Sequence, residues 1–455
     1  MHERPRLTPI QINRDLLRSV LETPMIFYVL LLLLMGLVGL GVVAATLLVT
    51  YGLGVTGLNH PVFWGFFIIN FVFWVGISHA GTMISAILRL SAAEWRRPVV
   101  RAAEVMTVFS LLTAALFVVL HTGRPWRTLY WAFPYDFVRG IWPDVRSPLV
   151  WDPSAIFTYL TGSILFVYAA LIPDLALARD KTTGWRRFVY GLLCLGWRGN
   201  ARQWKLLNAT GLLLSALILP VFVSVHSIVS WDFGMSLVPG WHVHIFAPYF
   251  VVGAVLSGVA AVIALMAVMR SLFQLHDYIR PEHFDMIGRL LIVVALAWAY
   301  FYFLDVVFAL LSNEEAEYEV MKLRLSPPYL YLFLLMITCN VFLPVPIWMF
   351  RKFRRNIGIM LITSLVVNIG MWLERFLIIV PTLQRRHPDA FAWGDYSASL
   401  VEIALVIFSF ANVGLLLLLF SKIFPVIPIW EEKEGHIWKR EFRIGKLRLP
   451  AIVRE

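Results

Sequence analysis

The sequence predicts an all-α membrane protein that crosses the bilayer ten times. The first observation is its composition: of 455 residues, 60% are hydrophobic and 15% are charged, whereas soluble domains carry about 25% charge. The second is that ten apolar segments reach the length of about 20 residues that a spanning helix needs. The third is the aromatic content, with 33 Phe and 18 Trp, which is typical of proteins with aromatic belts at membrane interfaces. A large soluble enzyme is thereby excluded.

The predicted spans follow one another through mostly short connections. They cover residues 25–50, 62–90, 99–121, 155–177, 206–229, 245–272, 284–311, 329–350, 357–380 and 397–424. Most are preceded by proline, where the missing backbone donor costs little. Pro220, Pro344 and Pro346 fall inside spans and predict kinks there.

Small residues on the second and sixth spans predict how the helices pack. These are Gly76, Ser78, Gly81, Gly253, Ser257 and Gly258. Such residues let membrane helices approach closely. We expect spans two to five and spans six to nine to form two four-helix bundles, related as a parallel repeat, with spans one and ten peripheral.

The distribution of basic residues predicts the orientation. With the N-terminus inside, 30 of the 39 Lys and Arg residues fall in inner segments and 8 in outer loops, so both termini are expected in the cytoplasm, at a bacterial inner membrane. Residues 1–23 then form a cytoplasmic arm with an amphipathic helix over 13–22, residues 24–425 the membrane domain, and residues 426–455 a basic cytoplasmic tail. Because the net charge of +11 arises from short loops, nucleic-acid binding is not expected.

The two cysteines carry little signal. Cys194 lies near a basic loop and Cys339 within an apolar span. They share no metal-ligand spacing, so neither an iron–sulphur cluster nor a structural zinc site is expected in this chain. A disulfide between them is not expected either.

Three titratable residues fall at the outer ends of predicted spans. His121 closes the third span, Asp152 precedes the fourth, and Asp232 ends the fifth. Each also has a structural interpretation: His121 as an interfacial histidine bonded to a carbonyl, Asp152 as a helix cap before Pro153, and Asp232 as a wetted loop acid. Together they place one base and two acids at one membrane surface, where they can accept protons from a bound donor.

Further candidates lie on the same side. They are Arg124, Trp231, His226, His242 and His244, which we assign to binding: Arg124 and the outer tryptophans would shape a pocket or dock a partner. A haem held by two histidines needs rings facing each other at matched depth, and His121 with His226 is the one pair that suits it.

A deeper group lies within the spans. It contains His79, Asp305, Glu374 and Arg375. Ionisable residues inside a membrane mark proton paths by default, and the alternative is a paired structural network. Glu374 and Arg375 are adjacent, so they are expected to face different neighbours and to pair with other helices.

Four strings of residues resemble a known family. They are HTGRPWR at 121–127, SIVSWDF at 227–233, PGWHVH at 239–244 and ISHAGT at 77–82. They are similar to the NrfD/PsrC family of quinone-binding membrane subunits, and most of all to the ten-helix C subunits (ActC) of alternative complex III. The resemblance covers about residues 24–425.

The resemblance implies a menaquinol-oxidising subunit without haem or iron–sulphur cluster of its own. The family's quinol-site histidine and two aspartates fall on His121, Asp152 and Asp232. The quinol would lie near the periplasmic surface, close to an iron–sulphur partner protein. The similar complex also holds multihaem cytochrome c subunits and a second, homologous membrane subunit. Polysulphide reduction matches less well, because eight-helix relatives lack two of the spans predicted here.

We therefore expect the quinol-binding subunit of an electron-transfer complex, an oxidoreductase only when assembled with its partners. Electrons would pass to the iron–sulphur partner and protons to the outer side, with coupling to proton translocation through the deeper group. Three alternatives stay open. They are a haem b membrane anchor, a proton-coupled secondary transporter and a scaffold with a decayed quinone site.

Overall fold

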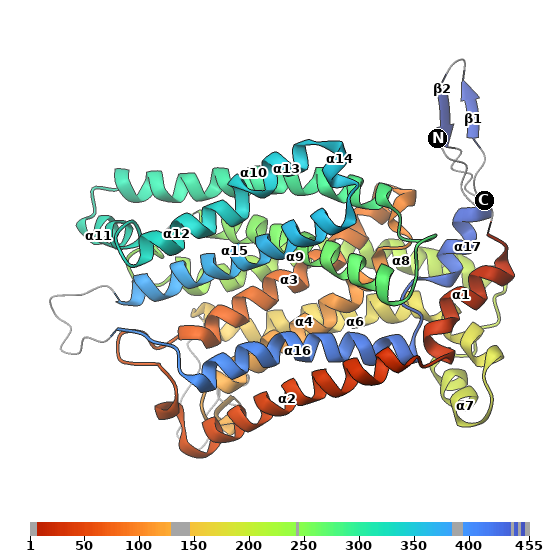
Figure 1. Ribbon diagram of the computed structural model, residues 1–455, viewed down its shortest axis with the longest axis horizontal. Coiled ribbons are helices and arrows are strands. Elements are labelled where there is room, and N and C mark those ends of the chain that lie inside the picture. Colours follow the sequence, from red (N-terminus) through yellow and green to blue (C-terminus); the bar gives the residue numbers. More distant parts are fainter. Residues whose placement is uncertain are drawn as a thin grey trace.

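The computed structural model describes residues 7–128, 146–242, 245–384, 395–437, 441–444 and 447–450. Within this part of the chain, ten helical spans are long and apolar enough to cross a membrane (Figure 1): α2 Met25–Tyr51, α3 Gly65–Leu90, α4 Val100–His121, α6 Pro148–Lys181, α8 Ala201–Gly234, α9 Phe246–Leu272, α10 Pro281–Leu311, Tyr329–Met349, α15 Ile357–Gln384 and α16 Leu400–Ile423. The predictions of an all-α fold and of ten spans are confirmed.

Two spans extend further than their apolar residues predict. Helix α6 begins at Pro148, with Ser147 as its N-cap, so Asp152 and Pro153 lie inside the helix. Helix α8 continues to Gly234, which places Asp232 in its last turn. The interpretation of Asp152 as a cap that precedes the helix is therefore wrong.

The eighth span is interrupted. It consists of α12 (Tyr329–Ile337), a π-helical turn η4 (Thr338–Phe342) and α13, which starts at Pro344 (Pro344–Met349). The break lies where proline predicted a kink, because a proline cannot continue the backbone hydrogen bonds of the preceding turn.

The remaining elements are short. They are α1 (Pro9–Leu21), η1 (Leu53–Val55), η2 (Glu94–Arg96), η3 (Pro125–Arg127), α7 (Gly184–Leu193), α11 (Glu315–Arg324), α14 (Arg351–Arg354), α17 (Ile429–Ile437), β1 (Glu441–Ile444) and β2 (Leu447–Pro450). The two strands pair antiparallel as a hairpin. Helix α1 buries Ile12, Leu16, Leu17 and Val20 along one face, as an amphipathic helix does.

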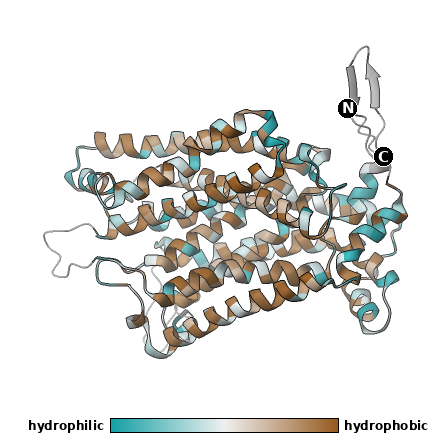
Figure 2. Ribbon diagram, viewed as in Figure 1, coloured by the Kyte–Doolittle hydropathy of each residue, from teal (hydrophilic) through white to brown (hydrophobic). Residues whose placement is uncertain are grey.

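The spans lie side by side, so the molecule has two polar ends. We call the end that carries His121 and α11 the site end, and the end that carries α1, α7 and α17 the tail end (Figure 1). Figure 2 shows apolar residues along most of each span and hydrophilic residues gathered towards the two ends. This is the pattern expected of helices that cross a bilayer.

Helix α3 lies at the centre of the arrangement. It packs against α4, α8 and α9, whereas α2 packs mainly against α16. Residues along most of α3 are buried, including polar ones. Helices α3 and α9 approach closely, since a Cβ placed on Gly258 of α9 would lie 2.1 Å from the Cβ of Ala80 on α3. The division into two four-helix bundles stays a prediction.

Gly258→Ala is expected to destabilise the protein, because the added methyl group forces α3 and α9 apart. Overpacking of this kind typically costs about 1–3 kcal/mol. Thermal unfolding of the detergent-solubilised protein measures the effect. The matched control is Gly36→Ala in α2, where an added Cβ meets no atom within 4 Å. Equal melting temperatures for the two variants would show that the close approach is not needed.

Candidate functional site

Asp152 and Asp232 meet at the site end. Helix α6 begins there and α8 ends there, and the carboxyl groups of the two residues are in hydrogen-bonding contact. Asp152 is 3% exposed and Asp232 is half-buried. Two carboxylates in contact repel each other, and a proton held between them would remove that repulsion and supply the donor that the contact needs. The sequence placed both acids at one surface, and the structure brings them together.

Two tryptophans stand beside the carboxyl pair. Trp151 and Trp231 each precede one of the aspartates, and their rings meet edge to face with 6.2 Å between centroids. Trp231 is partly exposed. The carboxyl pair therefore has an aromatic neighbour surface, which suits a ligand with a flat apolar ring.

His121 is the last residue of α4, and its ring packs against Phe67 of α3 with 5.8 Å between centroids. Its Nδ1 is buried and has no hydrogen-bond partner among the described residues. One carboxyl oxygen each of Asp152 and Asp232 is buried without a partner as well. Buried polar atoms without partners cost free energy. All three predicted residues thus keep an atom that a ligand hydroxyl could satisfy.

The chain turns sharply after His121. Gly123 has a φ of +67°, which a residue with a side chain rarely adopts, and a Cβ there would lie 2.9 Å from the Cγ of Leu53. The Thr122 hydroxyl donates to the Val119 carbonyl at 2.7 Å and to the Arg124 carbonyl at 3.1 Å. This fixed turn leaves the Arg124 side chain exposed at the site end.

The other predicted histidines are distributed differently. His242 is exposed, with its Nδ1 3.0 Å from the Ser236 carbonyl oxygen, and His244 lies outside the described residues. Just before them in the motif, Trp241 is buried: its indole N–H donates to the Ile378 carbonyl at 2.7 Å and its ring stacks on Trp64. Trp241 anchors this loop, a role that sequence reasoning missed.

His226 belongs with the deeper group and not with the surface group. It is fully buried, and its ring lies 4.7 Å from that of His79, centroid to centroid. The ring of Tyr159 stacks on His79 at 4.6 Å with 6° between planes. Both ring nitrogens of His226 and the Nε2 of His79 lack hydrogen-bond partners among the described residues. The sequence missed both the histidine pair and Tyr159.

Glu374 and Arg375 pair with each other, contrary to expectation. Arg375 Nη1 lies 2.7 Å from Glu374 Oε2, an ion pair by distance without hydrogen-bonding geometry. Other helices contribute as well: the Tyr249 hydroxyl and the Trp298 indole both donate to Glu374 Oε1. The guanidinium of Arg375 stands 4.7 Å above the ring of Phe250. The adjacent side chains therefore bend towards one another inside a buried aromatic shell.

Asp305 has a different partner. Its Oδ2 lies 3.5 Å from Arg324 Nη1 in α11, and Arg324 also donates to the Thr382 hydroxyl at 3.0 Å. Phe250, by contrast, connects the other members of the deeper group, since it packs against His226 at 6.0 Å and under Arg375. The predicted group thus consists of a central cluster and a separate ion pair nearer the site end.

A cavity of about 450 Å³ lies at the opposite end of the molecule. It is bordered by Trp197, Trp204 and Trp430, among others. It therefore does not belong to the carboxyl pair. The described residues contain no group of three or more His, Cys, Asp or Glu placed to hold a metal ion.

Comparison with known proteins identifies relatives of the chain. Over 235 residues it is 27% identical to a protein of Halobacterium salinarum named as the membrane C subunit of a dimethyl sulfoxide reductase, and the match covers 51% of this chain and 49% of that protein. Over 425 residues it is 21% identical to the C subunit of the selenate reductase of Mesobacillus selenatarsenatis, a match that covers 87% of this chain and 93% of that relative. The chain thus spans about half the length of the first relative and nearly all of the second.

The family description "Polysulphide reductase, NrfD" matches residues 54–385. This range includes the carboxyl pair, His121, the histidine pair and the Glu374–Arg375 ion pair. The sequence strings that suggested this family lie inside the matched range. The chain belongs to the polysulphide reductase NrfD family of integral membrane subunits.

Proposed function

We propose that the chain is the menaquinol-binding and menaquinol-oxidising membrane subunit of a quinol:acceptor oxidoreductase complex of the alternative complex III type. The observation that carries this proposal is the contact between Asp152 and Asp232, with His121 at the same end and an unpartnered buried polar atom on each of the three. Membership of the NrfD family supports it. The two relatives, named as subunits of reductases, support it also.

Oxidation of a quinol releases two protons and two electrons. His121 takes one hydroxyl proton as a general base through its free Nδ1, and the carboxyl pair takes the other. The pair already shares one proton, so it passes protons on one at a time to water at the site end. Electrons leave one at a time for the cluster of an iron–sulphur partner protein. Trp151, Trp231 and Arg124 border the quinol ring and the docking site of the iron–sulphur partner protein.

The assembly follows from the same interpretation. In this proposal the site end faces the periplasm at a bacterial inner membrane and both termini lie in the cytoplasm, an orientation that the excess of basic residues in the inner segments supports. The iron–sulphur protein docks at the site end, together with multihaem cytochrome c subunits, and a homologous second membrane subunit packs in the bilayer. The deeper group, His79, His226, Glu374, Arg375 and Asp305, couples the reaction to proton translocation.

The packing of His226 argues against a haem b anchor. A haem between His121 and His226 needs both rings to face the iron from opposite sides of a porphyrin. Instead, the ring of His226 packs against His79 and Phe250, and the ring of His121 packs against Phe67. A reduced-minus-oxidised spectrum of the purified chain checks this point, since a b-type band would contradict the proposal.

Asp232→Asn tests the site in the assembled complex. The amide still donates a hydrogen bond to Asp152 but cannot carry a proton, so kcat for menaquinol is expected to fall by about 10²-fold or more with little change in KM. The matched control is Asp180→Asn, an exposed aspartate at the tail end. Unchanged turnover at limiting and at saturating quinol would leave a transporter or an inactive scaffold as the better explanation, and solute uptake by the isolated chain separates these two.

A further inference from the structure

A row of polar residues runs along one face of α3. Ser78, Thr82, Ser85 and Arg89 are spaced by four, three and four residues, which puts them on the same side of a helix. The first three are fully buried, and the side chain of Arg89 is 13% exposed. Polar side chains on the inner face of a membrane helix need partners or a function. The proposed quinol site uses none of them.

Neighbouring helices supply side-chain partners for Thr82, Ser85 and Arg89, whereas the Ser78 hydroxyl donates to the Val75 carbonyl of its own helix. The Thr82 hydroxyl lies 2.5 Å from the hydroxyl of Tyr159 in α6. The Ser85 hydroxyl donates to the carboxylate of Glu104 in α4. Since Tyr159 stacks on His79, these contacts lead from the histidine pair in the middle of the bundle towards the tail end. We call Ser78, Thr82, Ser85, Tyr159 and Glu104 the α3 file.

Glu104 is the carboxyl group of the α3 file. It is 2% exposed, and the charged groups that face it are Arg89, Glu431 and Arg101. Both arginines have carboxylates of their own: Arg89 pairs with Glu431 at 2.8 Å, and Arg101 pairs with Asp174 at 2.5 Å. Glu104 therefore has no ion pair among the described residues. It is a buried carboxyl group whose charge can change without breaking a salt bridge.

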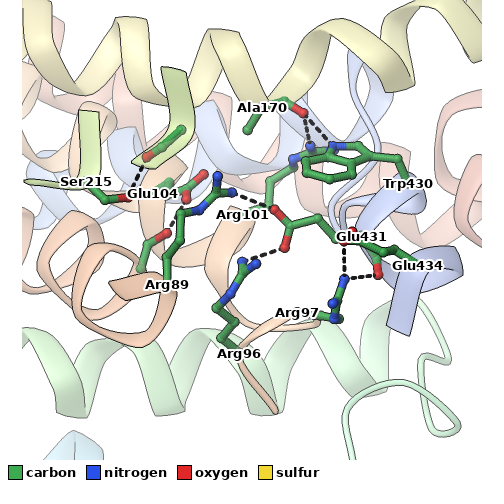
Figure 3. A network of polar contacts seen from close by, with 12 residues as sticks. Arg89, Arg96, Arg97, Arg101, Glu104, Ala170, Ser215, Trp430, Glu431 and Glu434 are labelled. Atoms are coloured by element: carbon green, nitrogen blue, oxygen red, sulfur yellow. Dashed lines mark hydrogen bonds and ion pairs between the residues drawn. The ribbon is translucent and has the colours of Figure 1, made fainter. Parts of the chain in front are cut away.

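A second set of charged residues lies where the α3 file reaches the tail end (Figure 3). Glu431 of α17 accepts from Arg89 at 2.8 Å and from Arg96 at 2.5 Å, and it is 1% exposed. Between this cluster and the file lies a cavity of about 10 Å³ bordered by Arg89, Glu104 and Gly211, among others. This space is roughly that of one water molecule, and its walls offer polar partners for it. One water molecule can thus lie beside Glu104 and Arg89, on the side of the α3 file that faces the tail end.

We propose that the α3 file is a proton-uptake path from the tail-end surface to His79 and His226. The Glu104 carboxylate takes a proton from water beside Arg89. That proton leaves for Ser85 or a bridging water, and each hydroxyl onwards, Thr82 and then Tyr159, accepts one proton while it donates another. Because the rings of Tyr159 and His79 stack face to face, the last transfer passes through a bridging water to an unpartnered ring nitrogen of the histidine pair. The path adds a route of proton uptake to the proposed function. It rests on that function, because quinol oxidation is the reaction that draws protons along the path.

Glu104→Gln tests the path in the assembled complex reconstituted into vesicles. The amide keeps an acceptor for Ser85 but cannot carry the proton. During menaquinol oxidation, the wild-type complex is expected to take up protons from the tail side, and the variant is expected to lose this uptake while electron transfer continues. Tyr159→Phe, which removes one hydroxyl deeper in the file, is expected to give the same loss and decides the question if Glu104→Gln does not assemble. The matched control is Ser409→Ala, a fully buried hydroxyl of α16 outside the file that bonds to its own helix.

The outcomes separate this path from the proposed function. Two outcomes overturn the path alone. In the first, Glu104→Gln oxidises quinol normally and takes up as many protons from the tail side as the wild type. In the second, the wild type oxidises quinol but takes up no protons from the tail side. If the wild-type complex does not oxidise quinol, the proposed function fails, and proton flux driven by a potassium diffusion potential then decides. A flux that is lower in Glu104→Gln than in Ser409→Ala supports the path, and equal flux overturns it.

Discussion

Replacing His121 by Ala is expected to lower quinol-driven turnover of the assembled complex by about 10²-fold or more, because a positioned general base contributes a factor of that size. Steady-state reduction of the acceptor by menaquinol measures the loss. The matched control is His60→Ala, since His60 is an exposed histidine in the segment between α2 and α3 at the same end of the molecule. That control is expected to turn over like the wild type.

The same substitution should affect stability less than activity. The ring packs against Phe67, but His121 ends its helix and its Nδ1 bonds to no described residue, so packing is lost without that hydrogen bond. Loss of activity with an unaltered melting temperature therefore points to chemistry at the ring. If activity and melting temperature fall together, or if turnover survives at all quinol concentrations, the histidine is structural.

Replacing Glu431 by Ala is expected to destabilise the protein by about 3–5 kcal/mol, the cost of leaving buried charges without their partner. Arg89 and Arg96 both pair with this carboxylate, and their side chains are 13% and 11% exposed. Thermal unfolding of the solubilised protein measures the effect. The matched control is Glu22→Ala, whose partner Arg18 is at the surface, where a pair contributes about 0–1 kcal/mol. Similar effects of the two substitutions would show that the Arg89–Glu431 pair lies in water.

The same residue predicts how stability depends on pH. Burial by itself would raise the pKa of Glu431, but Arg96, Arg89 and Arg97 outweigh it, and the pKa lies below its ordinary value of 4.5. A carboxyl group with a lowered pKa stabilises the fold above its ordinary pKa and loses that contribution as the pH falls through the lowered value. Acid should therefore destabilise the wild type more than Glu431→Gln. Parallel pH profiles of the melting temperature would contradict this.

Much of the fold follows from the sequence because hydropathy is a local property. Ten apolar stretches give ten spans, and their alternation alone places His121, Asp152 and Asp232 at one end. The predicted start of α6 is too late because Asp152 before Pro153 has the pattern of a helix cap. In the structure α6 begins at Pro148 and Asp152 contacts Asp232 of α8, a contact that is invisible in a local pattern.

Contacts between side chains on different helices could not be predicted from the sequence, for a related reason. The pairing of His226 with His79, and of Asp152 with Asp232, depends on how each helix is rotated about its axis, which hydropathy does not fix when a helix is apolar on all sides. One signal was present: Ser78, Thr82, Ser85 and Arg89 repeat at helical spacing, and a polar stripe on a membrane helix marks its protein-facing side.

The ion pair between Arg89 and Glu431 joins residues that are 342 positions apart. Since a ribosome makes the chain from its N-terminus, the basic segment between α3 and α4 is in place long before α17 exists. Until translation reaches Glu431, Arg89 and Arg96 lack the carboxylate that pairs with them in the finished fold. The basic segment is therefore neutralised only once the C-terminal helix has been made.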